Sequence, residues 1–116
     1  MWLATQHGFY ATVQQEGAYH VRSQRRGDLA NLKKQVELAG GIEEGTDVEY
    51  PFCVVVTKPE FIAIMNFLAE DLNYENFKAQ IHRSPDQNHK TSSYIFIWSE
   101  MARLQKKQQR QSEDAG

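Results

Sequence analysis

The sequence contains a single cysteine, Cys53, among its 116 residues. One cysteine cannot form an intramolecular disulfide, and it cannot build a cysteine-based zinc site. This usage is typical of a protein from a reducing compartment. Because Cys53 lies in the apolar run 52–56, we expect a small buried side chain at this position rather than a nucleophile.

Long apolar stretches are also absent. The longest apolar runs cover residues 52–56 and 94–98, and both are far too short to cross a bilayer. Residues 1–5 have neither the basic region nor the apolar core of a signal peptide. These features predict a cytoplasmic protein with no membrane partner.

The sequence has little excess charge of either sign and no familiar catalytic motif. The formal net charge is −2, which argues against a protein that binds nucleic acid over its whole surface. There is no glycine-rich phosphate loop, no Gly-x-Ser-x-Gly elbow and no Cys-x-x-Cys pair. The sequence therefore favours a protein that is not an enzyme, and it implies no cofactor.

The composition supports a packed core, because 41% of the residues are apolar and 11% are aromatic. Residues 2–24 alternate between apolar and polar side chains around Glu16-Gly17, which predicts a β-hairpin. The segment 50–56 predicts a central strand that is buried on both faces. Pro51 should lie at its beginning, because proline cannot donate to the ladder.

Helical spacing dominates the rest of the chain. Residues 28–39 predict a helix with Asp28 as its N-cap and Gly40-Gly41 as its stop. The pattern Thr57-Lys58-Pro59-Glu60 predicts a capping box at the start of the next helix. Its alternative role, an anion site at a helix N-terminus, is disfavoured because Glu60 occupies the first turn.

The C-terminal third predicts two more helices. Asn73 is expected to cap a short helix that carries Phe77 and Ile81, and residues 84–87 form a second capping-box pattern after a turn. The final helix is predicted up to Leu104. Residues 94–98 also have strand propensity, but the helical spacing continues beyond them.

These segments give the order β-β-β-α-β-α-α-α. We therefore predict an α+β fold in which helices cover one face of a mostly antiparallel sheet of about four strands. Residues 1–104 are expected to form a single domain. Residues 105–116 are polar, with no apolar residue before Ala115, and are expected to be disordered.

A basic group follows the hairpin and continues into the first predicted helix. It consists of Arg22, Arg25, Arg26, Lys33 and Lys34. Such a group is able to bind phosphates, as in a nucleic acid, or an acidic partner. The competing interpretation is an ordinary solvated face.

A histidine and carboxylate group offers an alternative, enzymatic interpretation. His82, Asp86 and His89, with Asp71 and Glu75 upstream, are residue types that bind metals or transfer protons. This interpretation predicts a small enzyme that acts on a phosphate-bearing substrate. A Ser-Pro break separates the two histidines, so their spacing does not place them on one helix, and ordinary loop residues remain the competing interpretation.

The chain has more large apolar side chains than its predicted core positions require, including those of Trp2, Tyr10 and Tyr19. Ile95 and Phe96 lie off the main stripe of the last helix. A helix that is apolar nearly all round is buried, either in its own core or against a partner. This pattern predicts docking of a protein partner or self-association as a dimer, with a wider core as the alternative.

Several segments resemble a family of small, uncharacterised bacterial proteins. The resemblance rests on Met1-Trp2-Leu3 and Gly8-Phe9-Tyr10, on Tyr74-Glu75-Asn76-Phe77-Lys78, and on a final helix that contains Trp98. The sequence departs from this pattern in lacking a histidine near Trp98. The resemblance implies a stand-alone domain and no particular activity. Together with the residue patterns, it leads us to expect a small binding or interaction module.

Overall fold

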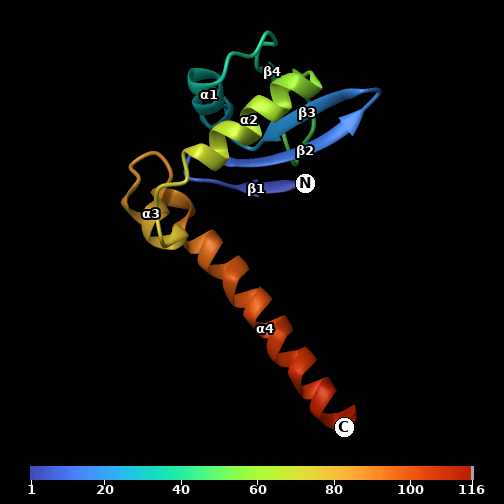
Figure 1. The fold of residues 1–116 in the computed structure, drawn as a ribbon, viewed down its shortest axis with the longest axis vertical. Coiled ribbons are helices and arrows are strands. Elements are labelled where there is room, and N and C mark those ends of the chain that lie inside the picture. The colour runs from blue at the N-terminus through green and yellow to red at the C-terminus, as the bar shows by residue number, and fades with distance from the viewer. Residues whose placement is uncertain (116) are drawn as a thin grey trace. The chain divides into compact units, whose positions relative to one another are not determined.

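The computed structural model describes the backbone of residues 1–115 and the side chains of residues 1–111. Its contacts divide the chain into two compact units, Met1–Tyr74 and Glu75–Gly116, and each unit is described by itself (Figure 1). The expectation of one domain over residues 1–104 stays a prediction. None of the helices described in residues 1–115 combines the length and apolar character needed to span a membrane.

The first unit contains a five-stranded antiparallel sheet. Its strands are β1 (Trp2–Ala4), β2 (Phe9–Gln15), β3 (Ala18–Ser23), β4 (Glu43–Glu44) and β5 (Phe52–Val56), in the spatial order β1-β2-β3-β5-β4. The α+β prediction is confirmed. The sequence did not reveal β4, because its two residues lie in an exposed acidic segment with no apolar pattern.

The predicted hairpin joins β2 to β3 through a two-residue turn. Glu16 and Gly17 both have positive φ, 52° and 79°, as a type I′ turn requires. Gln15 pairs with Ala18 on either side of it. The twist of this turn type matches that of the strands, which explains why a local pattern was enough to predict the hairpin.

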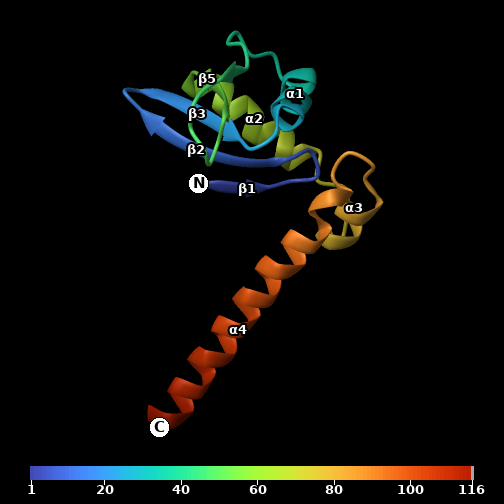
Figure 2. The same ribbon diagram turned by 180° about the vertical axis from the view of Figure 1, so that it is seen from behind.

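One face of the sheet carries the core of this unit. The pairing register places Tyr10, Val21, Val54 and Val56 on that face, where they are buried with residues of α1 and α2. Figure 2 shows the strands in front of α2, so that this helix lies behind the sheet in that view. On β5, Val54 and Val56 are buried whereas Cys53 is half-buried, so the prediction of a strand buried on both faces is wrong.

Helix α1 (Arg26–Gln35) begins and ends earlier than predicted. Its N-cap is Arg25 and its C-cap is Val36, so Asp28 is not the cap. The Asp28 carboxylate instead lies inside the first turn, 1% exposed, where it accepts from the backbone N–H of Phe9 at 3.1 Å. Asp28 therefore makes a tertiary hydrogen bond to Phe9 in place of the predicted N-cap hydrogen bond.

Helix α2 (Lys58–Glu70) begins as predicted. Thr57 accepts from the backbone N–H of Glu60, and the Glu60 carboxylate accepts from the backbone N–H of Thr57 at 2.8 Å. A second Glu60 oxygen accepts from the N–H of Ala39 at 2.8 Å. These backbone hydrogen bonds, first that of Thr57, lower the pKa of Glu60. The capping box is confirmed, and it also fastens the segment that follows α1.

The second unit contains α3 (Phe77–Arg83), a 3-10 turn η1 (Asn88–Lys90) and α4 (Thr91–Ala115). Asn76 caps α3 through Ala79, so the choice of Asn73 is wrong. The 84–87 segment forms a turn before η1 rather than a capping box, because Ser84 ends α3 and the Gln87 side chain is buried.

Helix α4 was predicted over residues 94–104 in preference to a strand, and the helix is confirmed. It continues to Ala115, so the expected polar tail is helical as far as that residue. Gln, Lys and Arg fill this part of the sequence, and all three have high helix propensity. Residue 116 lies outside the described residues.

The capping box makes a stability prediction. Thr57→Ala removes the side-chain acceptor for the Glu60 N–H and should lower the free energy of unfolding by about 1 kcal/mol. Urea denaturation followed by circular dichroism measures this loss. Thr46→Ala, at an exposed loop position, is the matched control and should leave the midpoint unchanged. Equal midpoints for the two variants would contradict the capping role.

Candidate functional site

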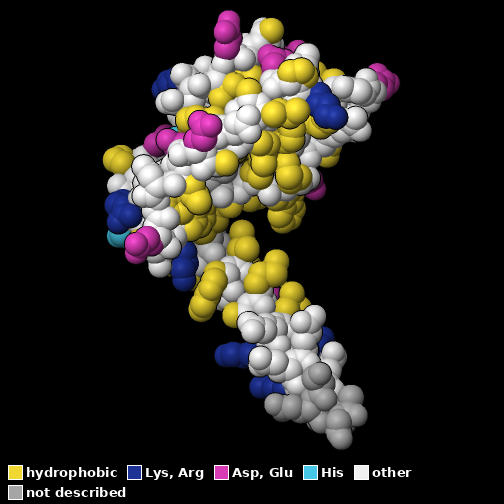
Figure 3. All heavy atoms as spheres, viewed as in Figure 1, with side chains coloured by type: hydrophobic (Ala, Val, Ile, Leu, Met, Phe, Trp, Pro, Cys, Tyr) yellow, Lys and Arg dark blue, Asp and Glu magenta, His cyan; other side chains and the backbone are white. Residues whose placement is uncertain are grey.

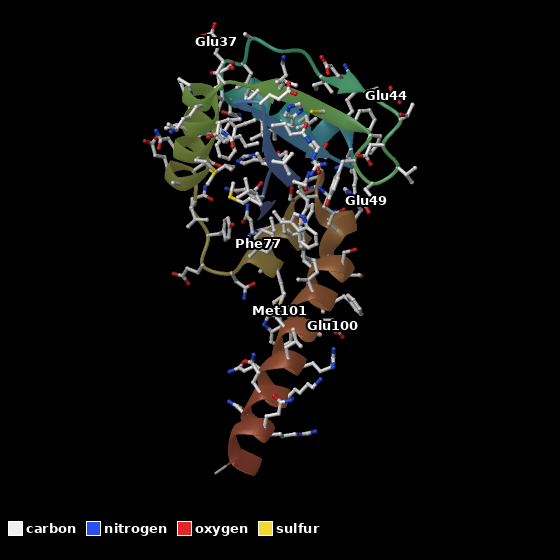
Figure 4. The ribbon with its side chains drawn as sticks, turned by 90° about the vertical axis from the view of Figure 1, so that its right-hand side faces the viewer. Glu37, Glu44, Glu49, Phe77, Glu100 and Met101 are labelled. Atoms are coloured by element: carbon white, nitrogen blue, oxygen red, sulfur yellow. The ribbon has the colours of Figure 1, made fainter. Side chains whose placement is uncertain are left out.

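The most conspicuous surface feature is a set of exposed apolar side chains in the N-terminal half of α4. Tyr94 is buried, but the next large apolar residues of this helix are all exposed, by 42 to 66%. They are Ile95, Phe96, Ile97, Trp98, Met101 and Leu104. Figure 3 shows hydrophobic side chains gathered on the N-terminal half of α4, and Figure 4 shows Met101 on the helix.

The sequence anticipated only part of this surface. It selected Ile95 and Phe96, which are 44% and 66% exposed. Trp98, Met101 and Leu104, which continue the helical spacing of the predicted helix, are also exposed. Of the other apolar residues noted above, Tyr10 is fully buried and Trp2 is 72% exposed.

We define the apolar stripe as Ile97, Trp98, Met101 and Leu104. At 3.6 residues per turn, these positions follow one side of the helix. Trp98 is held within its own unit by Lys78, whose Nζ lies 4.1 Å from the centre of the indole ring. The cation orients this ring but leaves 58% of the residue exposed.

A basic face lies on the other side of α4. Its members are spaced i, i+3, i+4 and i+7, which places them about 140° to 240° around the helix from Met101. They are Arg103, Lys106, Lys107 and Arg110, and all four are exposed. This face is not among the sequence-based predictions, although the spacing of the cations was sufficient to reveal it.

Short-range contacts near this face are weak. Glu100 pairs with Arg103 at 3.0 Å, and both side chains are largely exposed. An exposed ion pair of this kind contributes about 0.2–1 kcal/mol or less. This ion pair therefore contributes little to the stability of α4. The apolar stripe remains the dominant surface feature of the helix.

Three of the five side chains in the basic group predicted from the sequence make polar contacts within the first unit. Arg25 pairs with the buried Asp28 at 3.0 Å. Arg22 donates to the carbonyl of Ala11 at 3.3 Å and lies over the ring of Tyr50. Lys33 donates to the carbonyl of Gly40. Of the five, Arg26 and Lys34 are exposed and the other three are half-buried, so the group is not a continuous free cationic surface.

The histidine and carboxylate group is exposed. His82 lies on α3, Asp86 in the turn that follows, and His89 in η1, and none of the three is buried. Asp86 accepts from the side-chain amide of Gln87 at 2.8 Å. Among the side chains that the structure describes, those of residues 1–111, no group of three or more His, Cys, Asp and Glu is able to hold a metal ion, so the geometry gives the metal alternative no support.

A histidine that the sequence analysis did not single out lies beside a pocket of the first unit. His7 Nε2 lies 2.6 Å from Asp71 Oδ2, and the pocket that both residues line has a volume of about 240 Å³. The two residues lie 64 positions apart in the sequence, and no local pattern connects them. Only the folded chain reveals this pair.

Comparisons with known proteins add no assignment. The chain matches no protein-family model, no curated protein and no solved structure. The resemblance to small bacterial proteins stays an expectation.

The buried Asp28 makes a prediction about the basic group. Asp28→Ala removes the partner of Arg25 and the acceptor of the Phe9 N–H inside the first unit. We expect a loss of about 2–4 kcal/mol in the free energy of unfolding. Denaturation should show no comparable loss for Glu37→Ala, which removes an exposed carboxylate. A loss below about 0.5 kcal/mol for Asp28→Ala would contradict this structural role.

Cys53 makes a second prediction. Burial raises the pKa of its thiol, the carboxylate of Glu43 raises it further, and Arg22 opposes these effects. A raised pKa lowers the thiolate fraction at neutral pH. Iodoacetamide should therefore modify Cys53 more slowly in the native protein than in the urea-unfolded chain at the same pH, as followed by mass spectrometry. Faster modification of the native protein would instead indicate an activated nucleophile.

Proposed function

We propose that this protein is an interaction module that associates with a second copy of itself through α4. The observation that carries the proposal is the exposed apolar stripe, Ile97, Trp98, Met101 and Leu104. Burial of exposed apolar surface stabilises a complex by roughly 25 cal/mol for each Å² that is removed from water. A contiguous stripe of large side chains on one helix is a typical association surface.

The area of the stripe agrees with a reversible dimer. A large apolar or aromatic side chain has an area on the order of 200 Å². With the exposed fractions of the four residues, between 42 and 63%, the stripe exposes roughly 400 Å². Two copies would then bury about 800 Å², which corresponds to a weak and reversible interface.

The charges of α4 are compatible with this pairing. The basic face lies opposite the stripe, so two stripes can meet without bringing the cations of the two copies together. A two-fold axis makes the same patch serve both partners, and each copy contributes the same residues. An antiparallel arrangement would also separate the two basic C-terminal halves.

The two other candidate functions have less support. Binding of an anionic partner by the basic group would require Arg22, Arg25 and Lys33 to leave hydrogen bonds within the first unit. An enzyme based on His82, Asp86 and His89 would require convergence on a pocket, and these residues line none of the pockets described.

If the stripe is the interface, an added charge should weaken self-association when it lies on the stripe and have no effect when it lies on the other side of α4. Met101→Lys places a cation on the stripe, whereas Ser99→Lys adds the same charge to an exposed position on the other side of α4. We expect the wild-type protein to dimerise with a Kd on the order of 10 µM. Met101→Lys should weaken association by more than tenfold, because a charge would be buried without a partner.

Sedimentation velocity over a range of protein concentrations measures both variants. Ser99→Lys should retain the wild-type Kd, and circular dichroism should show the same helix content in all three proteins. A wild-type protein that stays monomeric at 100-fold higher concentration than the expected Kd would contradict the proposal. Equal Kd values for Met101→Lys and the wild type would place the interface elsewhere.

A further inference from the structure

The pocket beside His7 lies where the turn after β1 meets the C-terminal end of α2. All the residues that line it belong to the first unit. Its walls are mostly apolar, and its polar side includes Gln6, His7 and Asp71. The apolar walls are formed chiefly by Leu3, Met65, Leu68 and Leu72.

Asp71 is held in a fixed orientation at this pocket. Its Oδ2 accepts from Gln6 Nε2 at 3.0 Å and from His7 Nε2 at 2.6 Å. An ionised carboxylate only accepts hydrogen bonds, so His7 is the donor in this pair. The ring of His7 packs against Phe67, with 5.1 Å between the ring centres. The other carboxylate oxygen, Oδ1, accepts no hydrogen bond from the side chains that the structure describes, those of residues 1–111.

The electrostatics of the pocket favour a cation. Asp71 is the C-cap of α2, where the helix dipole places partial negative charge. The last turn of α2 contains no basic residue, and Glu70 adds a second carboxylate next to Asp71. Neither Lys nor Arg is among the residues that line the pocket. In the part of the chain that the structure describes, the Asp71 carboxylate is therefore contacted by the imidazole of His7 and the amide of Gln6, and by no Lys or Arg that lines the pocket.

We propose that this pocket binds a small organic amine with an apolar body. The ammonium group would donate to Asp71 Oδ1, and the apolar body would contact Leu3, Met65 and Leu68. A cavity of about 150 Å³ accepts benzene, so a pocket of about 240 Å³ has room for a phenyl ring and a short aminoalkyl chain. The aromatic ring of Tyr74, which also lines the pocket, adds a group that attracts a cation.

The test uses the full-length protein and three probes of similar shape. Phenethylamine is the cationic probe, 2-phenylethanol is its neutral counterpart and phenylacetate is its anionic counterpart. Titrations followed by two-dimensional amide NMR should give saturable shifts in residues 3–7 and 65–74 with the amine, with a Kd on the order of 1 mM. The alcohol should bind at least tenfold more weakly, and phenylacetate should not bind.

Two variants locate the charge that selects the amine. Asp71→Asn keeps a side-chain oxygen but removes the charge, and should abolish the preference for the amine over the alcohol. Glu70→Gln removes the neighbouring carboxylate, which does not line the pocket, and should keep most of that preference.

Each outcome is decisive for the wild-type protein, even if Asp71→Asn is unstable. Equal affinity for the amine and the alcohol would overturn the proposal in favour of a merely apolar pocket. Shifts that do not saturate, or that lie outside residues 3–7 and 65–74, would overturn it as well.

Discussion

The first unit depends on one buried carboxylate, that of Asp28. It accepts from the N–H of Phe9 and from Arg25, while the Asp28 carbonyl accepts from the Tyr10 hydroxyl at 2.7 Å. These contacts fasten the start of β2 to α1. They also require glycine at position 8, because a Cβ there would lie 2.6 Å from the Cβ of Asp28. The turn before β2 is thereby fixed, and His7 is presented to Asp71 from that turn.

Features governed by neighbouring residues were the ones that the sequence predicted well. The Glu16-Gly17 turn and the Thr57–Glu60 capping box both follow from conformational preferences within four residues. Asp28 is also a suitable N-cap residue, but its carboxylate accepts a hydrogen bond from the N–H of Phe9, which lies 19 positions earlier in the sequence. Strand β4 has no apolar pattern, and its pairing with β5 depends on tertiary folding. The His7–Asp71 pair is likewise a product of the fold alone.

The sequence pointed to Ile95 and Phe96 as an interaction surface on α4; both are exposed, but the proposed stripe consists of other residues of the same helix. Helical spacing groups Ile97, Trp98, Met101 and Leu104 on one side, but spacing does not tell whether that side faces the core of its own chain or a partner. In the second unit Tyr94 packs edge-on against Phe77, with 4.9 Å between ring centres, and Ile81 is fully buried. This small core ends at the first turn of α4. Beyond it, large apolar side chains continue along the helix without being buried, and cations occupy the opposite side.

The apolar stripe should become buried when two copies meet, and the fluorescence of Trp98 tests this burial most directly. The sequence has two tryptophans, so a Trp2→Phe variant leaves Trp98 as the only indole reporter. On dilution from well above to well below the expected Kd, the emission maximum should move to longer wavelength as the ring enters water. Light scattering on the same samples should show the dimer giving way to the monomer. Emission that stays at the long-wavelength, water-exposed position at every concentration, with a monomer mass throughout, would contradict the account.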